Sequence, residues 1–252
     1  MLDFNHQPTL SEKLTDLIDS ALQTESQAQT PRNYLGASRL GVACDRALQF
    51  EFTNTAVDEG RTFTGRTLRI FAAGHVFEDL AINWLRQAGF DLYTETASGG
   101  QFGFAAVNGR LCGHVDGVLA GGPESIGKGY PALWECKSLN AKSWKDTVKR
   151  GVTLSKPVYA AQIALYQAYM EEQIPGISSH PAMFTAINKD TAELYFEWVP
   201  FNGELAQRAS DRGVRVIQAT DAGELLPRIS KDPAHYECKF CSWQDRCWQG
   251  GA

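Results

Sequence analysis

The chain has 252 residues, of which 43% are hydrophobic and 21% charged, a composition typical of a globular protein with a sizeable core. Its formal net charge of -5 excludes a generally basic surface, although a local basic groove is compatible with it. No apolar run approaches the length of a membrane span, and the first residues lack the basic and apolar regions of a signal peptide. We therefore expect a cytoplasmic protein whose six cysteines are ligands or buried thiols rather than disulfides.

The N-terminal segment is predicted to be one helix and a linker. Apolar residues recur at helical spacing over residues 9–24, behind the capping candidates Thr9 and Ser11. Residues 23–33 are polar and contain Pro31, which favours a linker. We therefore divide the chain into residues 1–33 and one large domain over residues 34–252.

The large domain is predicted to combine helices with a sheet. Helical periodicity covers residues 68–88, 157–170 and 201–220, and a further helix is expected to begin close to Cys44. Six strands are predicted over residues 90–96, 101–107, 110–119, 131–138, 182–188 and 193–199. The Asn108-Gly109 pair indicates a tight hairpin. We expect the first four strands to form one antiparallel meander, which the last two extend.

Two of these strands are predicted to carry an acidic metal site. The first contains Gly113-His114-Val115-Asp116 and the second contains Leu133-Trp134-Glu135-Cys136-Lys137. Since side chains alternate along a strand, Glu135 and Lys137 share one face, and Asp116 can converge on them from the neighbouring strand. Two carboxylates beside a lysine suit Mg²⁺ or Mn²⁺ and a hydrolytic reaction with activated water. The alternative is a solvated strand face, on which this acidic pair has no function.

Two helices offer further site residues. Glu78 lies within the helix predicted over 68–88, and His75 is nearly one turn before it, so both can face the same site. Gln162 and Tyr166 are four residues apart in the helix over 157–170, which places both on one face. There they can reach a backbone phosphate or hold the carboxylates and the lysine in place.

A basic segment follows the Lys137 strand. Residues 137–150 contain five basic residues and one acidic residue, Asp146. This pattern predicts a phosphate-facing patch, and a solvated helix face is the alternative. The basic residues that we assign to nucleic-acid binding are Lys142, Lys145, Lys149 and Arg150.

The C-terminal tail carries a second pattern with metal-ligand spacing. Cys238, Cys241 and Cys247 form a C-x₂-C-x₅-C set, and Cys44 is the best candidate for a fourth ligand. Four thiolates can hold Zn²⁺ or an iron-sulfur cluster, and the spacing does not distinguish these. Either group would connect the two ends of the chain and so restrict the unfolded state.

Taken in order, these motifs resemble the RecB-like branch of the PD-(D/E)xK nucleases. The resemblance rests on Glu78 four residues after Gly74, on Asp116 in Gly-His-Val-Asp, on Glu135-Cys136-Lys137, and on Gln162-x-x-x-Tyr166. Together with the four cysteines, it extends over residues 36–248 and is similar to the iron-sulfur members of this branch. Those members include AddB-type helicase-nuclease subunits and small CRISPR-associated exonucleases.

The resemblance implies a restriction-endonuclease-like α/β fold, in which helices flank a mixed sheet. It implies that Glu78, Asp116 and Glu135 are metal ligands, that Lys137 is the catalytic lysine, and that the four cysteines hold a [4Fe-4S] cluster, with zinc as the alternative. Many relatives have histidine at the position of Glu78, and His75 is out of register here. The third metal ligand is therefore Glu78 or His75.

The function implied is that of a Mg²⁺- or Mn²⁺-dependent DNA exonuclease acting on single strands or strand ends, in recombination, repair or CRISPR adaptation. The alternative is a non-catalytic nucleic-acid-binding subunit of a larger DNA-processing complex. The chain lacks a Walker-type phosphate loop, so any helicase activity must come from another chain. A helicase, a recombinase or an adaptation complex is the expected partner.

Overall fold

The computed structural model describes residues 7–249, and a five-stranded mixed sheet lies at its centre. The strand order is β2-β5-β6-β7-β8. The long central strand β6 pairs antiparallel with β5 and parallel with β7, and β7 pairs antiparallel with β8. The strand bounds are β2 Asp91–Tyr93, β5 Gly117–Gly121, β6 Ala132–Leu139, β7 Ala182–Asn188 and β8 Leu194–Val199.

A second, three-stranded sheet has the order β1-β4-β3, with bounds β1 Leu35–Gly36, β3 Gly103–Ala106 and β4 Leu111–His114. The predicted hairpin at Asn108-Gly109 is confirmed, and both residues have positive φ. The prediction of a single antiparallel meander is wrong, because residues 110–119 contribute to β4 in the small sheet and to β5 in the large one. Val115 is fully buried at the crossing, and it donates from its backbone N–H to the Phe102 carbonyl before the chain changes sheets.

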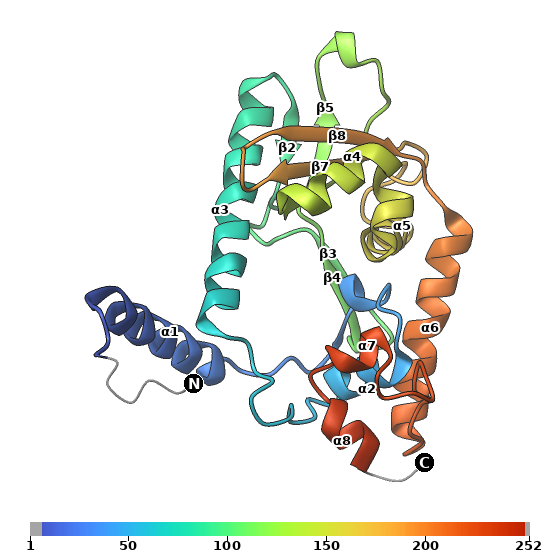
Figure 1. The fold of residues 1–252 in the computed structure, drawn as a ribbon. Coiled ribbons are helices and arrows are strands. Elements are labelled where there is room, and N and C mark those ends of the chain that lie inside the picture. Colours follow the sequence, from blue (N-terminus) through green and yellow to red (C-terminus); the bar gives the residue numbers. More distant parts are fainter. Residues whose placement is uncertain (1–6, 250–252) are drawn as a thin grey trace.

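Helices cover both faces of the large sheet, in an arrangement consistent with a restriction-endonuclease-like fold (Figure 1). Helix α3 packs on one face through Ala81 and Leu85, and α5 and α6 belong to the apolar core on the other face. The helix bounds are α1 Leu10–Ala28, α2 Asp45–Phe52, α3 Gly65–Gln87, α4 Ala141–Ser155, α5 Pro157–Met170, α6 Gly203–Asp221, α7 Tyr236–Lys239 and α8 Gln244–Gln249, with short 3-10 turns at Ala37–Arg39 and Glu124–Ile126.

The alternation predicted for β6 is confirmed. Trp134 and Cys136 point into the core beneath α3. Leu133 and Leu139 point into the core beneath α5, and Glu135 lies on that same side, in contact with Gln162 of α5. The central strand therefore places its one buried carboxylate between the sheet and a helix.

Helix α1 extends away from the sheet and packs against the start of α3 (Figure 1). It begins with a capping box between Thr9 and Glu12 and has no buried residue. Asp19 pairs with Arg69, and Gln23 donates to the Phe63 carbonyl. The helix continues to Ala28, so the linker expected over residues 23–33 is shorter than predicted. Within residues 7–249, no helix is long and apolar enough to cross a membrane.

Candidate active site

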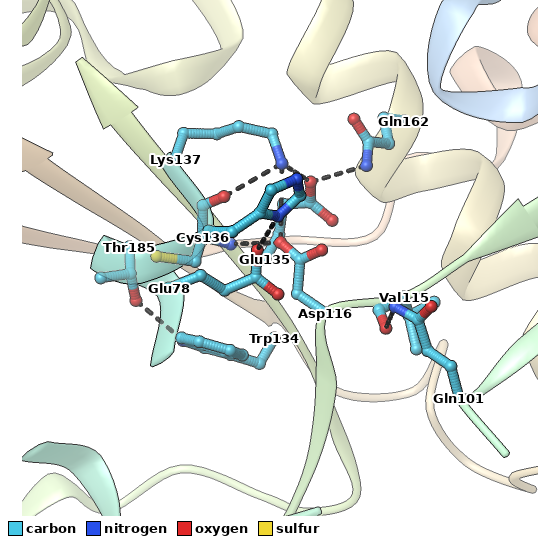
Figure 2. A network of polar contacts seen from close by, with 11 residues as sticks. Glu78, Gln101, Val115, Asp116, Trp134, Glu135, Cys136, Lys137, Gln162 and Thr185 are labelled. Carbon is cyan, nitrogen blue, oxygen red and sulfur yellow. Dashed lines mark hydrogen bonds and ion pairs between the residues drawn. The ribbon is translucent and has the colours of Figure 1, made fainter. Parts of the chain in front are cut away.

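The carboxylates of Asp116 and Glu135 meet where β5 begins. Gly117 pairs with Trp134 across the two strands, which brings the preceding Asp116 beside Glu135. The Cys136 backbone N–H donates to Asp116 Oδ2 at 2.8 Å and holds that carboxylate in place. The Glu135 side chain is fully buried, and that of Asp116 is 14% exposed. The predicted convergence is thus present, and Figure 2 shows both carboxylates with their neighbours.

Lys137 lies between these two carboxylates. Its ammonium contacts Glu135 Oε1 and is 3.5 Å from Asp116 Oδ2. It also donates to the Cys136 carbonyl at 3.0 Å, and it lies 5.7 Å from the ring centre of Tyr159. The lysine is therefore held by a carbonyl, two carboxylates and an aromatic face.

Helix α5 contributes the amide and the phenol that the sequence predicts. Gln162 Nε2 donates to Glu135 Oε1 at 2.6 Å. Tyr166 forms a side-chain hydrogen bond with Ser38. Burial and, to a smaller extent, the charge of Glu135 raise the pKa of the Tyr166 phenol. The i, i+4 spacing thus directs both side chains toward the carboxylates, as expected.

Glu78 reaches the same cluster from α3. Burial and the nearby Asp116 raise the pKa of Glu78 from its ordinary 4.5 to about 7, while Lys137 acts in the opposite direction. His75 is 83% exposed, and its Nδ1 lies 4.0 Å from Glu78 Oε2. Glu78, rather than His75, therefore faces the other two carboxylates.

The cluster contains more negative charge than Lys137 balances. Burial, followed by the charge of Asp116, raises the pKa of Glu135 to about 8, although Lys137 opposes this shift. Glu135 Oε2 is buried and has no hydrogen-bond partner. An unpartnered carboxylate oxygen next to two further carboxylates suits a hard divalent cation.

No group of three or more His, Cys, Asp or Glu side chains among residues 7–249 is already arranged to hold a metal ion. In the acidic cluster, Lys137 contacts Glu135 and lies close to Asp116. The ligand set Glu78, Asp116 and Glu135 therefore stays a prediction, which the unpartnered Glu135 oxygen supports.

The predicted basic patch lies on α4, directly after β6. Lys142, Lys145 and Lys149 are exposed and recur at helical spacing. Arg150 is exposed as well, but it pairs with Asp146 at 2.8 Å on its own helix. The three lysines therefore present the freer positive charge to solvent.

The four predicted cysteine ligands line one cavity of about 200 Å³. The pKa of the Cys238 and Cys241 thiols is raised by burial and by the neighbouring thiols. Arg46 donates to Cys247 Sγ at 3.8 Å. The remaining cysteines lie on β4 and β6, so the cavity gathers the four that the sequence singles out, Cys44, Cys238, Cys241 and Cys247.

The tail that carries three of these cysteines is held by the loop between α2 and α3. The buried Asp58 carboxylate accepts from the backbone N–H groups of Asp245 and Arg246, at 2.6 and 3.2 Å. Trp243 Nε1 donates to the Thr55 carbonyl at 2.8 Å. Asp58 was missed by the sequence analysis, because no local pattern marks an acid that caps a helix distant in sequence.

Two residues near the acidic cluster were also missed. Tyr159 lies three residues before Gln162 on α5, so helical spacing could have placed it on the site face. Ser38 belongs to the 3-10 turn after β1 and reaches Tyr166 only in the folded chain. No sequence signal could have identified it.

Comparisons with known proteins bear on the fold. No protein-family model matches the chain, and no curated protein matches its sequence. An alkaline exonuclease, LHK-Exo from Laribacter hongkongensis, is similar in structure with a TM-score of 0.51 and 15% identity, over 77% of this chain and 90% of that one.

Two further solved structures match less closely. The structure of SSO0001 has a TM-score of 0.48 and 15% identity, over 97% of this chain and 100% of that one. LHK-Exo in complex with dAMP has a TM-score of 0.49 and 13% identity, over 82% of this chain and 93% of that one. The likeness to the first LHK-Exo structure shows that this chain shares the fold of an alkaline exonuclease.

Proposed function

We propose that this chain is a metal-dependent DNA exonuclease of the iron-sulfur, RecB-like type, which hydrolyses phosphodiester bonds in single strands or at strand ends. The observation that carries the proposal is Glu135, a buried carboxylate with one unpartnered oxygen beside Asp116, Glu78 and Lys137. Burying a carboxylate without a partner is costly, so the arrangement suits a site completed by a cation. The shared fold with an alkaline exonuclease supports the same reaction class.

Glu78, Asp116 and Glu135 would hold Mg²⁺ or Mn²⁺, which when bound supplies Lewis-acid activation of the phosphodiester and of water. Gln162 fixes Glu135 Oε1 and leaves Oε2 free for the cation. Lys137 directs an ammonium at the same place, where it stabilises negative charge that develops on the phosphate. Tyr166 is buried near Glu135 and is hydrogen-bonded to Ser38, so it would hold its place when the cation binds.

The exposed lysines of α4, which begins immediately after the Lys137 strand, would hold the phosphate backbone. Such contacts are independent of base sequence and suit an enzyme that degrades DNA generally. Arg150 contributes less, because Asp146 already neutralises it.

A [4Fe-4S] cluster on Cys44, Cys238, Cys241 and Cys247 is the second part of the proposal, and zinc is the alternative. The cavity that these thiols share, and the Arg46 guanidinium beside Cys247, suit an anionic thiolate site. We assign the cluster to structure, because hydrolysis requires no electron transfer. Recombination, repair or CRISPR adaptation, with a helicase, a recombinase or an adaptation complex as partner, is the proposed setting.

The test is digestion of end-labelled single- and double-stranded DNA by protein purified without oxygen, with Mg²⁺ or Mn²⁺ or with EDTA. We expect metal-dependent digestion, which Lys137→Ala abolishes and which the surface control Lys128→Ala retains. Digestion at the wild-type rate by Lys137→Ala would show that the site is assigned wrongly. Binding of DNA without digestion by the wild type would favour the non-catalytic subunit instead.

A further inference from the structure

The face of α3 that carries Glu78 continues beyond the acidic cluster as an exposed aromatic surface. Residues three, four and seven apart share a helix face, so Gly74 and Phe71 lie in line with Glu78 toward the start of the helix. Phe63 follows at the same end, directly before the capping residue Thr64. In Figure 1 this half of α3 runs from the level of the large sheet toward α1.

Phe71 and Phe63 form a preassembled pair on this surface. Their rings meet edge to face, with centroids 5.2 Å apart and an interplanar angle of 84°. Phe71 is 47% exposed and Phe63 is 57% exposed. The Phe63 carbonyl accepts from Gln23 of α1, which holds the segment before the helix in place. Two large rings are therefore presented to solvent in a fixed position.

Between the rings and the acidic cluster, this face of α3 has no projecting side chain at Gly74. Gly74 carries no side chain, and a Cβ built there would lie 3.5 Å from the hydroxyl of Ser138, the residue after Lys137. Phe71 precedes Glu78 by seven residues, which is about 10 Å along a helix axis. A strand at duplex rise covers that distance in about three nucleotides.

Two arginines, Arg66 and Arg69, lie in the first two turns of α3, three and six residues after Phe63. Arg69 pairs with Asp19 of α1, whereas Arg66 is exposed and its side chain makes no hydrogen bond or ion pair in the part of the chain that the structure describes. An unpaired guanidinium at the same end of the helix as two exposed aromatic rings allows a single strand to place phosphates on the cation and bases on the rings. Bases in a duplex are already stacked on each other and cannot use such rings.

We propose that Phe71 and Phe63 are a stacking platform for unpaired bases of the DNA strand, about three nucleotides from the site of hydrolysis. The proposal rests on the proposed function and adds the substrate form, a single-stranded segment next to the scissile bond. Arg66 holds a phosphate of the same segment. A protein that docks on the two rings is the competing occupant.

The test is binding in EDTA, where no digestion occurs, measured by fluorescence anisotropy with labelled oligodeoxythymidine and with an abasic strand of equal length. Phe71→Leu keeps apolar bulk and removes the ring, and we expect it to weaken binding of oligodeoxythymidine by about tenfold. It should leave binding of the abasic strand unchanged. Phe71→Tyr should bind like the wild type, which shows that the position tolerates substitution. The matched control is Phe196→Leu on β8, because Phe196 is 46% exposed and lines a pocket with Trp84 at the C-terminal end of α3, the end opposite to Phe71.

The outcomes separate this proposal from the proposed function. If Phe71→Leu binds oligodeoxythymidine like the wild type, or loses equal affinity for both strands, the stacking platform is wrong. If the wild type still digests DNA with Mg²⁺ in that case, the proposed nuclease function stands without the platform. If the wild type neither binds nor digests any DNA, the proposed function fails and the platform with it.

Discussion

At the residue scale, the Glu135–Lys137 pair is the most consequential contact of the molecule. Both side chains lie on the α5 side of β6, and Glu135 is fully buried while Lys137 is 23% exposed. A buried pair of this kind adds little net stability, because desolvation offsets the attraction between the charges. Its retention in a core strand is better explained by chemistry, since Lys137 can also face a phosphate.

Loss of the lysine should destabilise the fold in a pH-dependent manner. Lys137→Met leaves the Glu135 carboxylate without a cation, which costs about 3–5 kcal/mol when the carboxylate is ionised. At low pH Glu135 is protonated, so the substitution lowers the free energy of unfolding by less. Urea unfolding at about pH 5.5 and about pH 8.5 measures the difference. Lys142→Met, at an exposed position, is the control, and an equal loss at both pH values would contradict the explanation.

The two raised carboxyl pKa values predict how stability depends on pH without metal. The pKa of Glu78 is raised to about 7 and that of Glu135 to about 8, from an ordinary value of 4.5. At a pH above about 4.5, the folded chain therefore binds more protons than the unfolded chain. Their contribution to stability is complete below that pH and is lost as pH rises through about 7 to 8. Mg²⁺ or Mn²⁺ should restore it, because a cation stabilises the ionised carboxylates.

Thermal unfolding midpoints across this range, with EDTA or with a divalent ion, measure the effect. Glu78→Gln should flatten the decline in EDTA and reduce the gain from the divalent ion, while Glu59→Gln, at an exposed position, should change neither. A gain from Mg²⁺ in Glu78→Gln equal to that of the wild type would remove Glu78 from the ligand set.

At the scale of elements, the small sheet packs against α5, the helix that carries Gln162 and Tyr166. Gly113 of β4 lies against Phe104 and Tyr166, and a Cβ built there would come within 2.6 and 2.7 Å of their rings. The two rings meet edge to face, with centroids 5.7 Å apart. Because Gly113 has no side chain, α5 can approach the small sheet closely. This close approach places Tyr166 beside the acidic cluster.

Gly113→Ala should therefore impair both stability and catalysis. Overpacking of a filled core typically costs about 1–3 kcal/mol. Because Tyr166 has to move, the digestion rate should fall in protein that remains folded. Urea unfolding and single-turnover digestion are the measurements. Gly203→Ala at the start of α6 meets only the Phe201 ring at ordinary contact distance and should be neutral. Wild-type values for Gly113→Ala would show that the site does not depend on this packing.

Helix α4 predicts a dependence on salt. If Lys142, Lys145 and Lys149 contact phosphates, replacing each with alanine should reduce the slope of log affinity against log salt by about 0.7 for single-stranded DNA. The effect should be the same for all base sequences. Arg150→Ala should have less effect, since Asp146 pairs with the arginine. An unchanged slope in the triple variant would assign these lysines to an ordinary solvated helix face.

At the scale of the whole molecule, the cysteine cavity joins distant parts of the chain. Figure 1 shows α2 next to α7 and α8, although residues 53–235 separate α2 from α7 in sequence. Cys44 comes directly before α2, and the tail is fastened by Asp58 and Thr55. A group bound to all four thiols would make this connection permanent and restrict the unfolded chain strongly.

Metal analysis tests the group itself. We expect protein purified without oxygen to be brown and to contain about four iron and four labile sulfide per chain. Cys241→Ser should lose the iron and leave the tail open to proteolysis, whereas Cys112→Ser should retain both. A colourless protein with about one zinc and no labile sulfide would establish the zinc alternative.

Most elements were predictable because their patterns are local. The bounds of α5, Pro157–Met170, follow from its apolar composition and the proline at its start, and the β7–β8 hairpin from two apolar runs around a polar turn. The break at Val115–Asp116 was not predictable. Periodicity tells which face a residue occupies, but the sheet that a strand joins depends on partners elsewhere in the chain.

The amino-acid sequence alone determined which side chains share a face. Alternation placed Glu135 with Lys137, and helical spacing placed Gln162 with Tyr166 and His75 with Glu78, because these relations depend only on backbone geometry. Only the tertiary structure decided which faces meet. It brought Glu78 rather than His75 to the carboxylates, left Glu135 Oε2 without a partner, and docked the tail on Asp58. These outcomes depend on packing between segments far apart in sequence, which no local pattern encodes.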